Sequence, residues 1–85
     1  MSLGKALREA RKASGYSVDQ IAEKTRIRVA LIKALEAEDF DAAGGLAYAR
    51  AHIRSIAKTI DADIDLLITE FEKTTNQEER PMIEL

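Results

Sequence analysis

The chain has 85 residues, with 13 Lys and Arg, 15 Asp and Glu, one His and no Cys, and a formal net charge of −2. This length predicts one domain with a small hydrophobic core. The absence of Cys excludes disulfides and thiol chemistry, and a single His provides no zinc cluster. No apolar run approaches the roughly 20 residues of a membrane helix, and residues 1–15 are too charged for a signal peptide. Composition therefore disfavours a disulfide miniprotein, a membrane span and most enzymes.

The charges are distributed unevenly along the chain. Residues 1–33 carry eight basic and three acidic side chains, whereas residues 34–85 carry five basic and twelve acidic ones. A negative net charge therefore does not exclude an anionic partner, because the electric field near the first third of the chain is positive. The alternative is that this asymmetry belongs to an ordinary solubilising surface.

Apolar side chains at three- and four-residue steps predict a first amphipathic helix over residues 2–13. Gly15 follows it, at the place of a left-handed C-terminal cap. Ser17 and Gln20 have the spacing of a capping box and predict the start of a second helix, which ends near residue 24 or 25.

A third helix is expected over residues 27–37. Because only two or three residues link it to the second helix, the two must cross steeply. A fourth helix is expected over residues 46–60, after the only Gly pair, and Asp63 can cap a fifth. The polar end of the chain is expected to fray, which predicts a helix-turn-helix domain over residues 1–74 and a flexible tail over residues 75–85. No strand pattern is found.

The second and third predicted helices fit a twenty-residue helix-turn-helix pattern that begins at Val18. The fifth place needs a small residue where the helices approach closely, and it holds Ala22. The tenth, fifteenth and eighteenth places need apolar residues and hold Ile27, Ile32 and Leu35. The ninth place usually holds Gly but here holds Arg26, which can form the turn at some cost if its φ is positive. A helix-turn-helix is the favoured interpretation, with a generic three-helix bundle as the alternative.

A family resemblance extends from Leu3 to about Lys73 and is carried by two runs, LGKALREARKASGYSVDQIAEKTRIRVALIKALEAEDFD and YARAHIRSIAKTIDADIDLLITEFE. These runs resemble the lambda-repressor-like helix-turn-helix domain of the RodZ family. The resemblance implies a cytoplasmic domain that binds the bacterial actin MreB and supports rod shape. In the family this domain precedes a basic stretch, one membrane helix and a periplasmic region. No membrane helix follows here, so we expect an excised domain or a stand-alone relative, with membrane contact only through a segment absent from this chain.

The third predicted helix is the first candidate binding surface. In repressors of this fold its exposed residues contact base edges in the major groove. The matching places hold Arg28, Val29, Ala30, Lys33, Ala34 and Ala37. Most of these side chains are small and apolar and form no hydrogen bonds to bases. The candidate DNA-binding residues, mainly for phosphates, are Lys24, Arg26, Arg28, Val29 and Lys33. We expect weak, salt-dependent affinity of roughly 10⁻⁴–10⁻⁶ M, unless these basic residues are only solvated charges.

The fourth predicted helix is the second candidate surface. The resemblance implies an aromatic pair near its start that helps bind MreB, at the positions of Tyr48 and His52, although His52 is not an aromatic hydrocarbon ring. Arg50 and Arg54 match arginines of the family and can pair with acidic groups on a partner. The alternative for Tyr48 is a core aromatic residue. The alternative for the two arginines is a salt bridge within the chain, with Glu36, Glu38, Asp39 or Asp41 as the acidic partner.

Other chemistry finds little support. The carboxylates of residues 61–72 have a spacing like that of a calcium loop, but Leu66 stands where that loop needs Gly. His52 has no second metal ligand nearby, and Gly44-Gly45 lacks the Lys-Ser/Thr of a phosphate-binding loop. The sequence predicts no enzyme, no cofactor and no metal site.

The predicted fold is an all-α, five-helix, lambda-repressor-like bundle. Its expected core consists of Leu3, Leu7, Ala10, Ile21, Ala22, Ile27, Ile32, Leu35, Ile53, Ile56, Ala57 and Leu67. One functional hypothesis is a cytoplasmic RodZ-like adaptor that binds an actin-like protein of the MreB type, with at most weak, non-specific binding to duplex DNA. The other is a DNA-binding transcriptional regulator of the lambda-repressor-like (XRE) type. The regulator would need dimerisation, such as a weak homodimer, or a partner for affinity.

Overall fold

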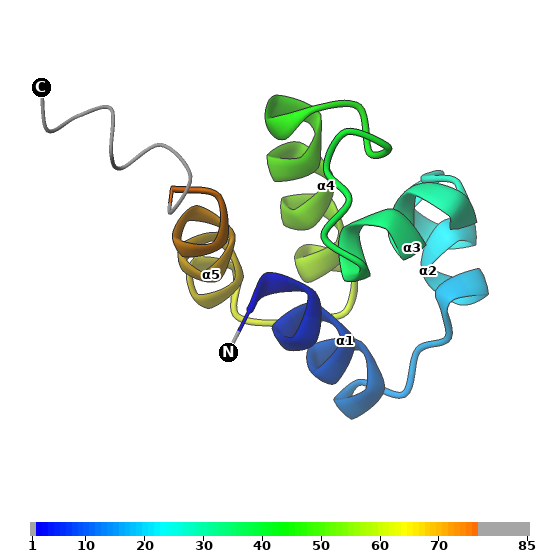
Figure 1. Cartoon of the computed structure of the whole chain (residues 1–85). Coiled ribbons are helices and arrows are strands. Elements are labelled where there is room, and N and C mark those ends of the chain that lie inside the picture. Colours follow the sequence, from blue (N-terminus) through cyan, green and yellow to red (C-terminus); the bar gives the residue numbers. More distant parts are fainter. Residues whose placement is uncertain (1, 77–85) are drawn as a thin grey trace, which may run out of the picture.

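The computed structural model describes residues 2–76 and places five α-helices in them (Figure 1). They are α1 (Leu3–Ala13), α2 (Val18–Thr25), α3 (Val29–Glu36), α4 (Leu46–Thr59) and α5 (Ile64–Asn76). In Figure 1, α4 stands between α5 on one side and the α2–α3 pair on the other, and α1 lies across the end of the bundle. α4 contacts both α2 and α5, and α1 contacts α3 and α5. The prediction of an all-α, five-helix domain is confirmed.

The helix starts follow local side-chain chemistry. The capping box predicted at Ser17 is present, since the Gln20 N–H donates to Ser17 Oγ at 3.1 Å and the Ser17 N–H donates to Gln20 Oε1 at 2.9 Å. Asp63 accepts a hydrogen bond from the Leu66 N–H at 3.1 Å and so satisfies a first-turn donor of α5. Both caps were predicted from residue type and spacing alone.

Three helices end in the same backbone motif. Gly15, Glu38 and Asp61 follow α1, α3 and α4 with φ of 78°, 62° and 58°. In each case the N–H of the next residue donates to a carbonyl oxygen of the helix's last turn, at 3.2, 2.8 and 2.8 Å. These are Schellman caps, which favour Gly at the left-handed residue. The prediction for Gly15 is confirmed, whereas Glu38 and Asp61 adopt this conformation at a steric cost.

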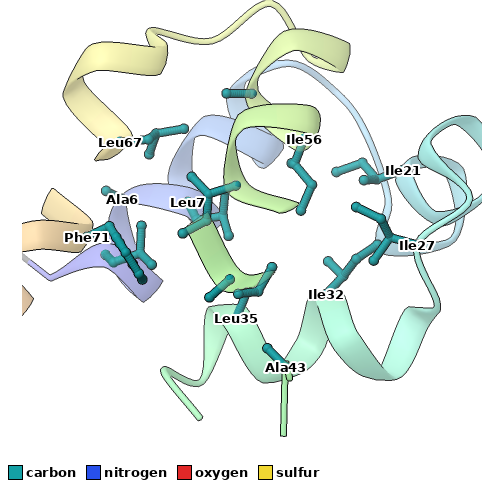
Figure 2. Close-up of a cluster of buried hydrophobic side chains, with 14 of the residues drawn as sticks. Ala6, Leu7, Ile21, Ile27, Ile32, Leu35, Ala43, Ile56, Leu67 and Phe71 are labelled. Atoms are coloured by element: carbon teal, nitrogen blue, oxygen red, sulfur yellow. The ribbon is translucent and has the colours of Figure 1, made fainter. Parts of the chain in front are cut away.

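Side chains from every helix form the core, and they pack against α4 on two of its sides. Figure 2 shows Ile21, Ile27 and Ile32 on one side of Ile56, and Leu67 and Phe71 on the other. Ten of the twelve predicted core residues are buried, whereas Ala10 and Ala22 are only partly buried at its edge. Further buried hydrophobic side chains are Ala6, Ala34, Ala43, Ala49, Ile60 and Phe71.

The start of α1 is held by distant parts of the chain. The Gly4 N–H donates to Glu38 Oε2 at 2.8 Å, and the Leu3 N–H donates to Thr74 Oγ1 at 3.2 Å. Gly4 packs so closely on α3 that a Cβ there would collide with the backbone carbonyl of Glu36. This junction ties α1 to the ends of both α3 and α5.

Helix α5 extends beyond the predicted domain boundary at residue 74. It continues to Asn76, and Thr75 Oγ1 donates to the Phe71 carbonyl at 3.0 Å within it. Residues 75 and 76, which were assigned to the tail, thus belong to α5. The rest of the predicted tail, residues 77–85, lies outside the described residues.

Candidate interaction surfaces

The turn between α2 and α3 forms without Gly. Arg26 adopts the left-handed conformation, with φ of 64° and ψ of 20°, and its N–H donates to the Ala22 carbonyl at 2.9 Å. Thr25 Oγ1 accepts the Ile27 N–H at 3.1 Å and donates to the Ile21 carbonyl at 2.7 Å. The buried Ile27 side chain then anchors the turn in the core. Arg26 therefore occupies the usual glycine position in the conformation that glycine favours.

Basic side chains surround this turn. Lys24, Arg26, Arg28 and Lys33 are all exposed, and Val29 is partly buried. Arg28 is the N-cap residue of α3, where its side chain forms no capping hydrogen bond. The candidate DNA-binding residues therefore lie around one turn, on α3 and at the end of α2.

Fewer side chains are exposed on the outer face of α3 than the sequence predicts. Ala34 was expected to be exposed there, but it is only 9% exposed and belongs to the core. Ala34 lies about one turn after Ala30, which suggested that both side chains lie on the same face. Four residues at about 100° each exceed a full turn by about 40°, and this rotation places Ala34 towards the core. Ala30, Lys33 and Ala37 remain exposed. Only charged side chains therefore supply hydrogen-bond donors on this face.

The aromatic pair, Tyr48 and His52, lies on the solvent side of α4. Tyr48 is 65% exposed, and its ring stacks on that of His52 with a centroid distance of 6.2 Å and an interplanar angle of 27°. The exposure argues against the alternative of a core aromatic. The nearby Gly44 has a φ of 95°, a conformation that favours Gly, and a Cβ there would be in ordinary contact with Tyr48, at 3.4 Å.

Arg50 is engaged within the chain. Its Nη1 lies 2.9 Å from Glu72 Oε2, and its guanidinium carbon lies 5.3 Å from the Phe71 ring centroid. A salt bridge within the chain was the alternative, but the acidic partners expected for it, Glu36, Glu38, Asp39 and Asp41, are not the ones found. Glu72 is the acidic partner of Arg50 instead, because α5 packs directly against α4.

The four candidate protein-binding residues do not share one face. At about 100° per residue, Arg50 and Arg54 point roughly 200° away from Tyr48 and His52 around α4. Arg54 is exposed, on the side of the helix that Arg50 occupies. The aromatic pair and the arginines therefore present two separate surfaces.

A largely buried ion pair was not predicted from the sequence. Arg11 Nε donates to Glu36 Oε2 at 2.7 Å and Nη2 donates to Oε1 at 3.3 Å, while Nη1 donates to the Tyr16 carbonyl at 3.2 Å. Hydrogen bonding to Glu36 raises the pKa of Arg11, although burial opposes this shift. One feature of the sequence could have indicated the burial of Arg11. It lies four residues after Leu7 and eight after Leu3, in line with the buried stripe of α1.

Between residues 2 and 76, no three carboxylate, imidazole or thiol groups lie close enough to hold a metal ion. None of the helices in this range is long and apolar enough to cross a membrane.

The geometry defines a helix-turn-helix domain, and a family model described as "Helix-turn-helix domain" matches residues 6–67. The chain belongs to this helix-turn-helix family. It is also similar to the cytoskeleton protein RodZ of Streptococcus pneumoniae (strain ATCC BAA-255 / R6), with 30% identity over 71 residues. The match covers 84% of this chain and 26% of RodZ, so the chain spans about a quarter of that relative. No solved structure matches the chain.

Proposed function

We propose that the chain is a non-catalytic, cytoplasmic adaptor domain that binds an actin-like cytoskeletal protein of the MreB type. The observation that carries the proposal is the aromatic pair, because Tyr48 is the most exposed large hydrophobic side chain among the described residues. Aromatic side chains that become buried at an interface contribute strongly to affinity. The similarity to a cytoskeleton protein supports this choice of partner.

In this proposal the aromatic pair forms the main contact with the partner. Arg54 adds a positive charge on a separate face of α4. Stacking on His52 limits the orientations of Tyr48, so little side-chain entropy is lost when a partner covers it. Arg50 already binds Glu72 and Phe71, so it contributes less to a partner than its residue type suggests.

The test is calorimetric titration of the chain with a purified MreB-type protein. Tyr48→Ala should weaken binding by about 2 kcal/mol, roughly thirtyfold in affinity. Leu66→Ala is the matched control, because Leu66 is 49% exposed on α5, away from the pair. Equal losses in both variants, or no binding by the parent chain, would refute the adaptor function.

A DNA-binding transcriptional regulator is the second candidate function. The exposed basic residues around the α2–α3 turn favour it, since they can contact phosphates. The outer face of α3 has few groups that read bases, so we expect sequence-tolerant binding that disappears between about 50 and 200 mM salt. A weak homodimer would raise the affinity by engaging two half-sites.

DNA titration separates the two functions. Arg28→Ala should weaken binding to duplex DNA and leave MreB-type binding unchanged, whereas Tyr48→Ala should do the reverse. Nanomolar affinity for one sequence at physiological salt, with base-pair changes costing about 1–3 kcal/mol each, would favour the regulator instead.

A further inference from the structure

Glu70 of α5 is a buried carboxyl group without a partner. Its side chain belongs to a residue that is only 8% exposed. Its Oε1 atom accepts no hydrogen bond from residues 2–76, and the neighbouring Lys73 is exposed and forms no ion pair with it. A buried polar oxygen without a hydrogen bond destabilises the folded state. Glu70 therefore weakens the packing of α5 on the rest of the domain.

Glu70 lies in the seam between α5 and α1. Thr74, one turn later on the same side of α5, accepts the Leu3 N–H at 3.2 Å, and Ser14 Oγ donates to the Ile60 carbonyl at 3.0 Å just before α5. These two hydrogen bonds join the ends of the antiparallel helices, and Glu70 lies between them. The inward-facing side chains in the middle of α1 are apolar: Ala6, Leu7 and Ala10. None of them can donate a hydrogen bond to Glu70.

The other four helices have contacts with one another that do not involve α5. α1 packs on α3, and α2 packs on both α3 and α4. α5 packs on α1 and α4, and Figure 1 places it on the opposite side of α4 from the α2–α3 pair. The hydrophobic side chains that α5 buries completely are Leu67 and Phe71. α5 can therefore move away as one unit while α1–α4 keep their contacts, at the cost of exposing these two side chains.

The docked α5 also occupies Arg50 of α4. Arg50 Nη1 lies 2.9 Å from Glu72 Oε2, and the guanidinium carbon lies 5.3 Å from the Phe71 ring centroid. Both partners of Arg50 thus belong to α5. A carboxylate of another protein must compete with Glu72 for Arg50 as long as α5 is docked.

We infer that α5 is a releasable cover, which detaches from α1 and α4 as a unit while the other four helices stay folded. Glu70 favours the release, because its oxygen regains hydrogen bonds to water when the seam opens. Such a sub-global opening needs less free energy than unfolding of the whole domain. The Arg50–Glu72 pair is then an autoinhibitory contact, since release of α5 frees Arg50. This opening is independent of an MreB-type partner.

The test is native-state hydrogen exchange of the full chain, measured by mass spectrometry at increasing but sub-denaturing urea concentrations. Amides of α5 should exchange with a weaker urea dependence than amides of α2 and α3, because release of one helix exposes less surface than global unfolding. An equal urea dependence in α5 and in the α2–α3 pair would show that α5 opens only when the whole domain unfolds, and would overturn the proposal.

The variant Glu70→Met removes the unpaired oxygen and keeps an unbranched side chain. It should slow the exchange of α5 amides about tenfold or more, because the docked state no longer contains a buried oxygen without a partner. The matched control is Glu23→Met on α2, where the carboxylate is exposed and forms no ion pair with residues 2–76. The control should change α5 exchange by less than about twofold. Unchanged or faster α5 exchange in Glu70→Met, or the same change in both variants, would also overturn the proposal.

Discussion

Replacing Arg11 by Met tests whether the ion pair between α1 and α3 stabilises the fold. The side chains of Arg11 and Glu36 are 14% and 9% exposed, so the substitution leaves a largely buried carboxylate without its main partner. Removing one member of a buried pair costs about 3–5 kcal/mol. Arg8 remains 3.6 Å from Glu36 and compensates in part, so the lower end of that range applies. We expect a loss of about 3 kcal/mol, which lowers Tm by roughly 12–24 °C in a domain of this size.

The matched control is Arg50→Met. The side chains of Arg50 and Glu72 are 40% and 47% exposed, so solvent screens their attraction. An exposed ion pair contributes up to about 1 kcal/mol and an exposed cation–π contact about 0.5–1 kcal/mol. Arg50→Met should therefore destabilise the domain by about 1 kcal/mol, well below the effect of Arg11→Met.

Thermal and urea unfolding, followed by circular dichroism, measure these differences. A double variant Arg11→Met/Glu36→Leu should be more stable than Arg11→Met alone, because it removes the unpaired carboxylate as well. Similar losses in Arg11→Met and Arg50→Met, or a double variant less stable than Arg11→Met alone, would refute the reasoning.

The pH dependence of this pair follows from the direction of the shift. The pKa of Arg11 is raised above its ordinary value, mainly by the hydrogen bond to Glu36. A raised pKa in the folded state gives stability that is fully present below the ordinary value and is lost only above it. Ionisation of Arg11 therefore contributes no pH dependence to unfolding between about pH 6 and 9.

Two further substitutions test the backbone. Arg26→Gly should raise stability by about 0.5–1 kcal/mol, because it relieves the left-handed strain by more than it adds chain entropy; an unchanged or lower Tm would contradict this. Gly4→Ala should lower stability by about 1–3 kcal/mol despite the higher helix propensity of Ala, because the added Cβ would displace the Glu36 carbonyl. A gain in stability measured by urea unfolding would disprove the close packing of α1 on α3.

Local patterns in the sequence were sufficient to predict the helices and their ends. Ser17 and Gln20 form their capping box within four residues, and Gly15 caps α1 by its own conformational freedom. The apolar places from Ile21 to Leu35 also specified the helix-turn-helix, since each faces the core at helical spacing. These features depend on neighbours in the chain, so residue type and spacing decide them.

Tertiary packing decided which groups meet. Arg11 pairs with a residue 25 positions away and Arg50 with one 22 positions away, and α1 takes acceptors for its first N–H groups from Glu38 and Thr74. Periodicity shows which side of a helix is polar, but not which helix lies opposite, so the partner of Arg50 was predicted wrongly. The same limit explains the separation of Tyr48 from Arg50 and the burial of Ala34. The sequence determines the faces of each helix, whereas the relative positions of the helices determine what each face contacts.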